Sequence, residues 1–143
     1  MTPQTYANHR RFFPLFHFFA LPIVVLNVLM VFGGLVRHPS IGDVWPLIFA
    51  IGVAAGFLAC RASIVTVQDR LIGLEMRLRL AAVLPSELGA RIPELRIRQL
   101  VGLRFAGDAE LPQLVTRCLN GELRTADQVK REIREWRPDF VRA

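Results

Sequence analysis

Two long uncharged runs near the start of the chain constrain its fold more than any other feature. They cover residues 12–36, which is 25 residues, and residues 44–60, which is 17. A helix needs about 20 apolar residues to cross a bilayer, with a working range of roughly 17 to 25. Trp45 as an interfacial ring and Arg61 as a snorkelling cation extend the second run. The pattern predicts a two-helix transmembrane hairpin with spans at about 12–36 and 44–62.

The distribution of arginine predicts the orientation of this hairpin. Arg10 and Arg11 precede the first run, and the loop between the runs carries one basic and one acidic residue, Arg37 and Asp43. The chain after the second run begins with several arginines, namely Arg61, Arg70, Arg77 and Arg79. Positive residues near span ends stay on the cytoplasmic side. Both termini are therefore expected in the cytoplasm and the short loop outside.

The second span is expected to continue past the membrane as one helix to about Leu84. No proline or paired glycine lies between Leu47 and Leu84, and Pro85 then ends the helix. Apolar residues recur along this stretch in alternating steps of three and four: Ile64, Val67, Leu71, Leu74 and Leu78. That spacing is a heptad-like stripe on one side of a helix.

Three shorter helices are expected after the long one, which makes the fold all-α. The first is predicted over about 93–105 and the second after Asp108 as its N-cap, with Asn120-Gly121 as its end. Thr125 and Gln128 have the spacing of a capping box and predict the start of the third. Residues 1–62 would thus form the N-terminal segment and hairpin. Residues 63–143 would form a small cytoplasmic helical domain that buries a modest core.

Four segments carry a resemblance to a known family. They are Asn8-His9-x3-Phe13-Pro14-x2-His17, Gln68-Asp69-Arg70-x-Ile72-x-Leu74-Glu75-x-Arg77-x-Arg79, Gln99-Leu100-x2-Leu103-Arg104-Phe105-Ala106-x-Asp108-x-Glu110-Leu111 and Lys130-x2-Ile133-x2-Trp136-x2-Asp139. Together they resemble an uncharacterised family of small bacterial two-span membrane proteins, a domain of unknown function. The chain departs from the family pattern at Gly107, where the pattern has serine before the aspartate. The resemblance supports the two-span topology and implies no known activity, substrate or cofactor.

Polar and small residues within the spans are candidates for helix packing. Asn27 lies near the middle of the first span, where an uncompensated amide is costly, so it is expected to face the other helix or another subunit. Gly52 and Gly56 have the spacing of a close-packing motif. They are expected to dock either on the Gly33-Gly34 pair of the same chain or on a second copy, which would make a homodimer.

A polar cluster is predicted where both spans meet the cytoplasm. Its members are Asn8, His9, His17, Gln68, Asp69 and Arg70. Asp69 is expected to accept a hydrogen bond from the N-terminal segment. His17 lies beside the phenylalanines at positions 12, 13, 16, 18 and 19, an arrangement that fits either an apolar helix surface or a haem or quinone site. The second span has no histidine, so a second haem ligand would have to come from another copy. No metal site and no cofactor are expected.

Candidate partner contacts lie in the predicted helical domain. They are Arg104, Asp108, Glu110, Trp136 and Asp139, some of which can equally cap and pack helices. Glu75 and Arg79 have the spacing of an ordinary helix-surface ion pair. The net charge is +6, but acidic residues interrupt the basic ones in the last helix. That mixture argues against a nucleic-acid reader and favours a solvated face near anionic lipid.

The function that fits these features is a non-catalytic accessory or scaffold protein of the inner membrane. Its spans would dock among other membrane subunits, and its helical domain would present a surface to partners. One alternative is a cofactor- or quinone-associated subunit that uses His17 and the phenylalanine cluster. A second alternative is a membrane-tethered regulator that binds nucleic acid. No phosphate-binding loop, zinc spacing, nucleophile elbow or pair of catalytic acids is present.

Overall fold

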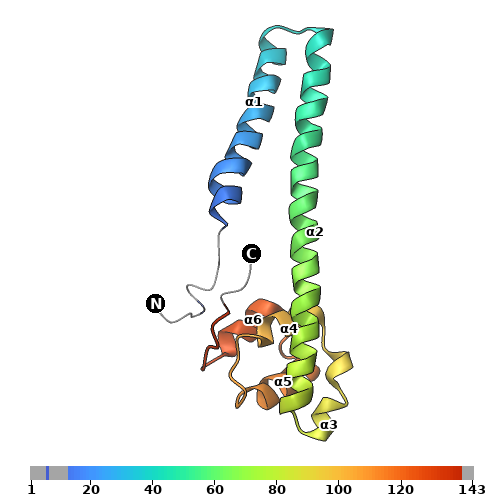
Figure 1. Cartoon of the computed structure of the whole chain (residues 1–143), viewed down its shortest axis with the longest axis vertical. Helices are drawn as coiled ribbons and strands as arrows, with labels where there is room; N and C mark the ends of the chain where they lie inside the picture. The colour runs from blue at the N-terminus through green and yellow to red at the C-terminus, as the bar shows by residue number, and fades with distance from the viewer. Residues whose placement is uncertain (1–5, 7–12, 140–143) are drawn as a thin grey trace. The chain divides into compact units, whose positions relative to one another are not determined.

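The computed structural model of the chain describes Tyr6 and residues 13–139, and every regular element among them is helical (Figure 1). The elements are, in order, the π-helix η1 (Leu15–Ala20), α1 (Leu21–Arg37), the 3-10 turn η2 (Ile41–Asp43), α2 (Val44–Val83), α3 (Ser86–Gly89), the 3-10 turn η3 (Ile92–Glu94), α4 (Ile97–Leu103), α5 (Leu111–Leu119) and α6 (Ala126–Glu132). The described residues divide into two compact units. The N-terminal unit lies within residues 11–65, and the C-terminal unit comprises residues 66–139 with Tyr6.

The N-terminal unit is a helical hairpin of η1, α1 and the first half of α2 (Figure 1). The π-helix lies between Pro14 and Pro22, and its wider turn is visible at its end, where the N–H of Leu21 bonds to the carbonyl of Phe16. Pro22 has no N–H with which to continue regular α-helical bonding, so an irregular turn before it is the expected response. The first apolar stretch therefore begins with an irregular turn, a π-helix, rather than with regular α-helix.

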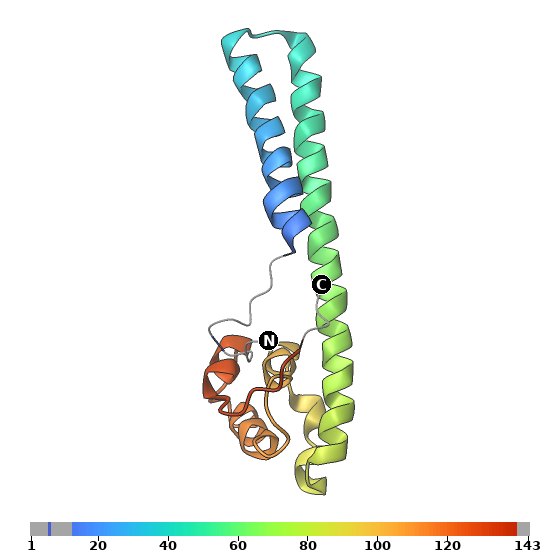
Figure 2. The same ribbon diagram turned by 60° about the vertical axis from the view of Figure 1, so that its left-hand side comes forward.

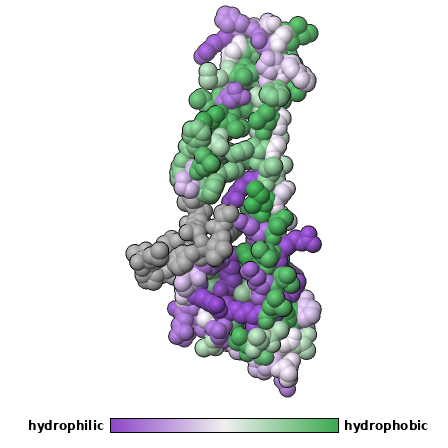
Figure 3. All heavy atoms as spheres, viewed as in Figure 1, coloured by the Kyte–Doolittle hydropathy of each residue, from purple (hydrophilic) through white to green (hydrophobic). Residues whose placement is uncertain are grey.

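Two helical stretches of the structure are long and apolar enough to cross a membrane, by length and composition: Leu15–Arg37 and Ile41–Val83. Their apolar side chains are mostly exposed. None of the residues in the most apolar window of the first stretch is buried, and only 6% of those in the second are. Figure 3 shows these hydrophobic residues over both helices of the N-terminal unit. The unit therefore has almost no core of its own.

The C-terminal unit has a continuous hydrophobic core. One face of the second half of α2 supplies Ile72, Met76 and Leu80, and α4 packs on that face, with α5 and α6 packed in turn on α4 (Figure 2). Leu95, Leu100, Leu103, Leu111, Leu114, Val115, Cys118 and Val129 complete the centre of this core. The tail thus packs on itself and does not depend on a partner for a core.

The long helix ends at Val83, close to the predicted Leu84, but its heptad stripe does not enter the core. Val67, Leu71, Leu74 and Leu78 are all exposed, and the core takes the neighbouring face instead. Gly73 on that face makes close packing possible, because a Cβ there would overlap the side chain of Ile97. α2 therefore carries two apolar faces in this unit, and the unit covers only one of them.

The structure corrects two of the predicted short helices. The helix predicted over 93–105 begins only at Ile97, since Arg96 has an extended backbone and its N–H bonds to the Gln99 side chain. Before it, α3 and η3 form two short turns that the sequence pattern did not reveal. α5 begins at Leu111 after Glu110, so Asp108 is not its N-cap.

The third short helix starts where predicted, but it ends at Glu132, so Ile133 and Trp136 lie beyond it. Thr125 accepts a hydrogen bond from the N–H of Gln128, and the Gln128 side chain accepts one from the N–H of Thr125, which completes the capping box. Gly121 has φ +79°, the left-handed geometry expected just after a helix end. These short-range signals determine local structure because their partners lie within one turn of each other.

Candidate functional site

An apolar cavity of about 340 Å3 lies in the N-terminal unit, between η1 and α2. Its walls are mostly aromatic and aliphatic: Phe13, Leu15, Phe16, Ala20, Phe57, Cys60, Arg61 and Ile64. The rings of Phe16 and Phe57 stack with their centroids 4.7 Å apart. The guanidinium of Arg61 lies 5.3 Å from the centroid of Phe16, a cation–π contact at the edge of the cavity. The site combines an apolar wall with one cation, which fits an amphiphilic ligand.

His17 does not line this cavity. Its Nδ1 atom lies 3.0 Å from the carbonyl oxygen of Phe13, and its ring meets Phe16 edge-on with centroids 5.0 Å apart. Of the phenylalanines in the predicted cluster, Phe13 and Phe16 reach the cavity, whereas Phe18 and Phe19 are exposed. Within residues 13–139 and Tyr6, no three His, Cys, Asp or Glu side chains gather as they would around a metal ion. The haem alternative therefore gains no second ligand from the described chain.

The predicted polar cluster is only partly within the described structure. Asn8 and His9 lie outside the described residues, so the bond predicted from the N-terminal segment to Asp69 stays a prediction. Gln68 and Asp69 are half-buried, and Arg70 is exposed. Among the described atoms, Oε1 of Gln68 and Oδ1 of Asp69 are buried without a hydrogen-bond donor.

The structure instead ties Tyr6 to α6. The Tyr6 hydroxyl donates to Oδ1 of Asp127 at 2.7 Å and accepts from Nε of Arg131 at 3.1 Å. Arg131 also pairs with Asp127 at 2.8 Å. The hydrogen bond from Tyr6 holds the pKa of the Asp127 carboxyl below its usual value, with help from Arg131. This contact was not predictable from the sequence pattern, because its partners lie 121 and 125 residues apart.

The residues predicted to pack helices in the spans make no close contact within the chain. Asn27 is exposed within the chain, so its contact with the other helix or another subunit stays a prediction. A Cβ placed on Gly33, Gly34, Gly52 or Gly56 would meet nothing within 4 Å. Docking of Gly52 and Gly56 on Gly33-Gly34 of the same chain is therefore not formed, and contact with a second copy stays a prediction.

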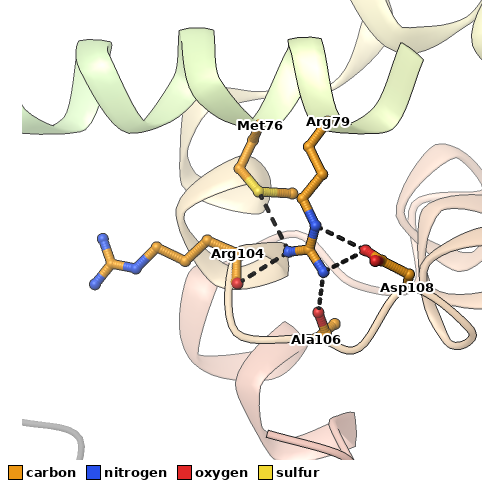
Figure 4. Close-up of polar contacts among 5 residues, drawn as sticks. All are labelled: Met76, Arg79, Arg104, Ala106 and Asp108. Carbon is orange, nitrogen blue, oxygen red and sulfur yellow. Dashed lines mark hydrogen bonds and ion pairs between the residues drawn. The ribbon is translucent and has the colours of Figure 1, made fainter. Parts of the chain in front are cut away.

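Arg79 organises the polar contacts of the C-terminal unit (Figure 4). Its guanidinium is paired with the Asp108 carboxylate at 2.6 Å and donates to the carbonyl oxygens of Arg104 at 3.2 Å and Ala106 at 2.7 Å. The loop between α4 and α5 is thereby fastened to α2. The predicted surface pair of Arg79 with Glu75 is wrong, since burial of Arg79 against this loop gives it three stronger partners.

The other residues predicted as partner contacts also have roles inside the unit. Oδ2 of Asp139 lies 3.1 Å from Nε of buried Arg104, and the Glu110 carboxylate accepts hydrogen bonds from the N–H groups of Arg134 at 2.9 Å and Glu135 at 2.8 Å. Trp136 packs against Phe105 with ring centroids 5.0 Å apart. These contacts hold the segment after α6 against the loop before α5. A role toward partners stays a prediction for all of them.

Two buried polar residues of this unit belong to the segments that resemble the family, but the sequence analysis assigned no role to either of them. Gln99 donates from Nε2 to the carbonyl oxygens of Leu123 at 2.7 Å and Cys118 at 3.1 Å, and so connects α4 to the end of α5. Lys130 is buried with Nζ 5.1 Å from the centroid of the Phe105 ring. In both cases the sequence signal for a buried polar side chain was its position within a periodic run of apolar residues.

Two basic side chains around α6, those of Arg117 and Arg131, are paired with acidic ones. Arg117 bonds to Glu122 at 3.0 Å and to Glu132 at 2.7 Å, which raises its pKa, and Arg131 pairs with Asp127. A polar depression of about 230 Å3 nearby is lined by both signs of charge. Nucleic-acid surfaces present unpaired cations, so this arrangement does not favour the nucleic-acid alternative.

Comparison with known proteins gives one match. The model of a family described as "Family of unknown function (DUF6526)" matches residues 1–143. Neither the curated proteins nor the solved structures gave a match. A match over the whole length agrees with the family resemblance carried by the four sequence segments. The chain belongs to this family of unknown function, DUF6526.

Proposed function

We propose that the chain is a non-catalytic integral membrane protein that anchors a helical domain at the cytoplasmic side of a bacterial inner membrane. The observation that carries this proposal is the exposure of the apolar side chains in the N-terminal unit. Phe18, Leu29 and Phe49 have exposed fractions of 70%, 60% and 63%. In water such a surface would associate or aggregate, whereas in a bilayer it is already in its preferred environment.

The charges at the ends of the hairpin support an orientation. Arg61 follows the second apolar run, and Arg70 and Arg77 are exposed further along α2. The loop that contains η2 carries one basic and one acidic residue. By the positive-inside rule, this imbalance favours a cytoplasmic C-terminal unit.

The polar contacts of the C-terminal unit support a structural or binding role. Arg79, Asp108, Glu110 and Gln99 satisfy one another or the backbone of adjacent loops. Side chains that make these hydrogen bonds and ion pairs stabilise the fold of the unit. Few polar side chains then remain available to act on a substrate. We therefore assign the unit to docking, within an assembly of other membrane subunits.

Membrane insertion is tested by flotation of cell membranes after an alkaline wash. We expect the full chain to float with the lipid. The Leu29→Arg variant is expected to lose most of that fraction, because a central arginine costs about 3 kcal/mol on insertion scales. Gln113→Arg is the control at an exposed site of α5 in the C-terminal unit and should float like the wild type. Wild-type protein that stays in the wash would refute the anchor.

The accessory role is tested separately, by native mass spectrometry of the protein isolated from its own membranes. We expect stoichiometric complexes with at least one other subunit. A protein that always emerges without any other polypeptide would contradict an accessory role while leaving the anchor intact.

The apolar cavity supports a second candidate function, the binding of a quinone or another amphiphile beside Arg61. An absorption spectrum and a solvent extract of the purified protein test it. Bound quinone or a haem band that is lost in Phe57→Ala would favour this function over the scaffold. A protein with neither would reject it, and Phe49→Ala, a change outside the cavity lining, is the matched control.

A further inference from the structure

The exposed side of α2 in the C-terminal unit repeats every seven residues. Val67 and Leu74 occupy one heptad position, d, and Leu71 and Leu78 occupy the other, a. All four are exposed, with fractions of 65%, 56%, 55% and 66% in the order given. We call these four residues the outer stripe. The stripe lies after the two long apolar runs of residues 12–36 and 44–60. An exposed apolar stripe at this place is expected to contact another protein surface.

The other heptad positions of α2 show that a second helix can reach the outer stripe. In a heptad, positions b, c and f point away from the coiled-coil partner. Here those positions are Ile72, Gly73, Met76, Arg79 and Leu80. They are the ones that pack on the rest of the unit or bond to its loop. The a and d residues are exposed, and so are Arg70 and Arg77 at position g and Glu75 at position e, as a second helix would require.

The charges beside the outer stripe favour a second copy of the same chain. Arg70 occupies position g and Glu75 the following position e, and both are exposed. In a parallel pair, each g residue meets the e residue five positions later on the other helix. Two copies would therefore form two symmetric pairs, each between Arg70 of one copy and Glu75 of the other. Neither residue has an ion pair within the described part of the chain.

An antiparallel pair of the same helices is disfavoured by charge. In that arrangement position g faces position g, so Arg70 and Arg77 of one copy would face arginines of the other. Anchoring in one membrane also points both copies the same way.

We propose that two copies of the chain associate through the outer stripe as a short parallel coiled coil over residues 67–78. This inference rests on the proposed membrane anchor, which supplies the common orientation. The segment holds fewer heptads than a free coiled coil needs, because an isolated helix must first be ordered. In this chain Ile72, Met76 and Leu80 already pack the helix into the core of its own unit. Association of two copies therefore does not require the helix to be ordered first. Confinement to one membrane further raises the effective concentration of the second copy.

Cysteine cross-linking of the full chain in membranes tests contact at the stripe. In a Cys60→Ser background, Leu74→Cys is treated with a short bismaleimide before detergent is added; native Cys118 is buried and stays in place. We expect a dimer band about fivefold stronger than for Gln113→Cys, an exposed control on α5, because d-position side chains meet across a parallel pair. Equal bands, or a product of another mass, would overturn the proposal.

A charge exchange tests the pairing without disturbing the fold. Glu75→Arg and Arg70→Glu, each alone, replace two attractions with two repulsions and should weaken association by about tenfold, measured by energy transfer between labelled copies in liposomes. The double variant Arg70→Glu/Glu75→Arg should restore wild-type association. A double variant as weak as the single ones would reject the parallel pairing with a second copy.

Flotation of the same samples separates this inference from the anchor. Variants that float but do not associate would refute the dimer and leave the anchor standing. Wild-type protein that does not float but still cross-links at Leu74→Cys would refute the anchor and retain the stripe as the contact.

Discussion

The two units of the chain place their apolar residues in opposite ways. In the N-terminal unit the large apolar side chains of α1 and the first half of α2 are exposed, and few polar contacts accompany them. In the C-terminal unit Leu100, Leu111 and Val115 are fully buried, and Arg79 and Gln99 fasten loops to helices. The second unit is stabilised by its own interior, whereas the first buries almost none of its apolar side chains within the chain. The same substitution should therefore have different consequences in the two units.

Truncation of a leucine should show the largest difference. Leu100→Ala is expected to lower the free energy of unfolding by about 3 kcal/mol, because it opens a cavity in a filled core. Leu29→Ala, in the exposed part of α1, should change it by less than about 0.5 kcal/mol. Denaturant titration in detergent measures both: Trp136 fluorescence in a Trp45→Phe background follows the C-terminal unit, and Trp45 fluorescence in a Trp136→Phe background follows the N-terminal unit. Equal losses of unfolding free energy in Leu100→Ala and Leu29→Ala would contradict the difference proposed between the two units.

The two cysteines should differ in their effect at alkaline pH. Burial raises the pKa of the Cys118 thiol to about 11. A raised pKa in the folded state stabilises the fold below the unfolded pKa, and this contribution is lost as the pH rises toward 11. We expect a loss of up to about 2.5 kcal/mol between pH 9 and 11. Cys118→Ala should flatten this dependence, whereas Cys60→Ala, at an exposed position, should keep the wild-type one; identical curves for all three proteins would contradict it.

Removal of the Arg79 contacts should have an intermediate effect. Arg79→Met leaves Asp108 and two carbonyl oxygens without their donor, so we expect a loss of about 2 kcal/mol of unfolding free energy. Arg98→Met, at an exposed site on α4, is the control and should stay within about 0.5 kcal/mol of wild type. Thermal unfolding followed by circular dichroism suffices. If Arg79→Met matches the control, the loop is held by its apolar contacts alone.

Two glycines allow the smallest and most selective comparison. A Cβ on Gly102 would lie 2.8 Å from Cβ of Val129 and 3.0 Å from the carbonyl oxygen of Ala126, whereas one on Gly52 would meet nothing within 4 Å. Both substitutions to alanine gain helix propensity, so the difference between them reports the steric cost. We expect Gly102→Ala to lose about 1 kcal/mol and Gly52→Ala to lose none. Calorimetry of the two variants checks this, and a stable Gly102→Ala would show that α4 and α6 can separate without cost.

Much of the secondary structure was predictable because its causes are local. The two apolar runs, the uninterrupted helix ending near Leu84 and the capping box at Thr125 all follow from residues close together in the sequence. The end of α5 at Asn120-Gly121 does too, since a glycine adopts the positive φ required there. The start of α4 was placed too early because Pro93 suits either a helix start or the 3-10 turn that it occupies.

The polar sites were less predictable because their partners are distant in the sequence. Tyr6 meets Asp127, and Arg79 meets Asp108, after the chain has folded. The sequence identified Asp108, Glu110 and Asp139 as notable residues, but it assigned them to a partner surface. In the structure, Asp108 pairs with Arg79 of α2, Glu110 bonds to the backbone after α6, and Asp139 pairs with Arg104.

By itself, the sequence determined that two apolar helices begin the chain and that one of them runs on into a helical domain. Only the tertiary structure decided which face of that helix the domain covers. Apolar residues surround the helix, with Val67, Leu71, Leu74 and Leu78 on one side and Ile72, Met76 and Leu80 on another, so periodicity alone allows either face. Gly73 resolves the choice, because the absence of a side chain there lets Ile97 approach α2 closely. The core forms where the helices fit, and the outer stripe is left exposed.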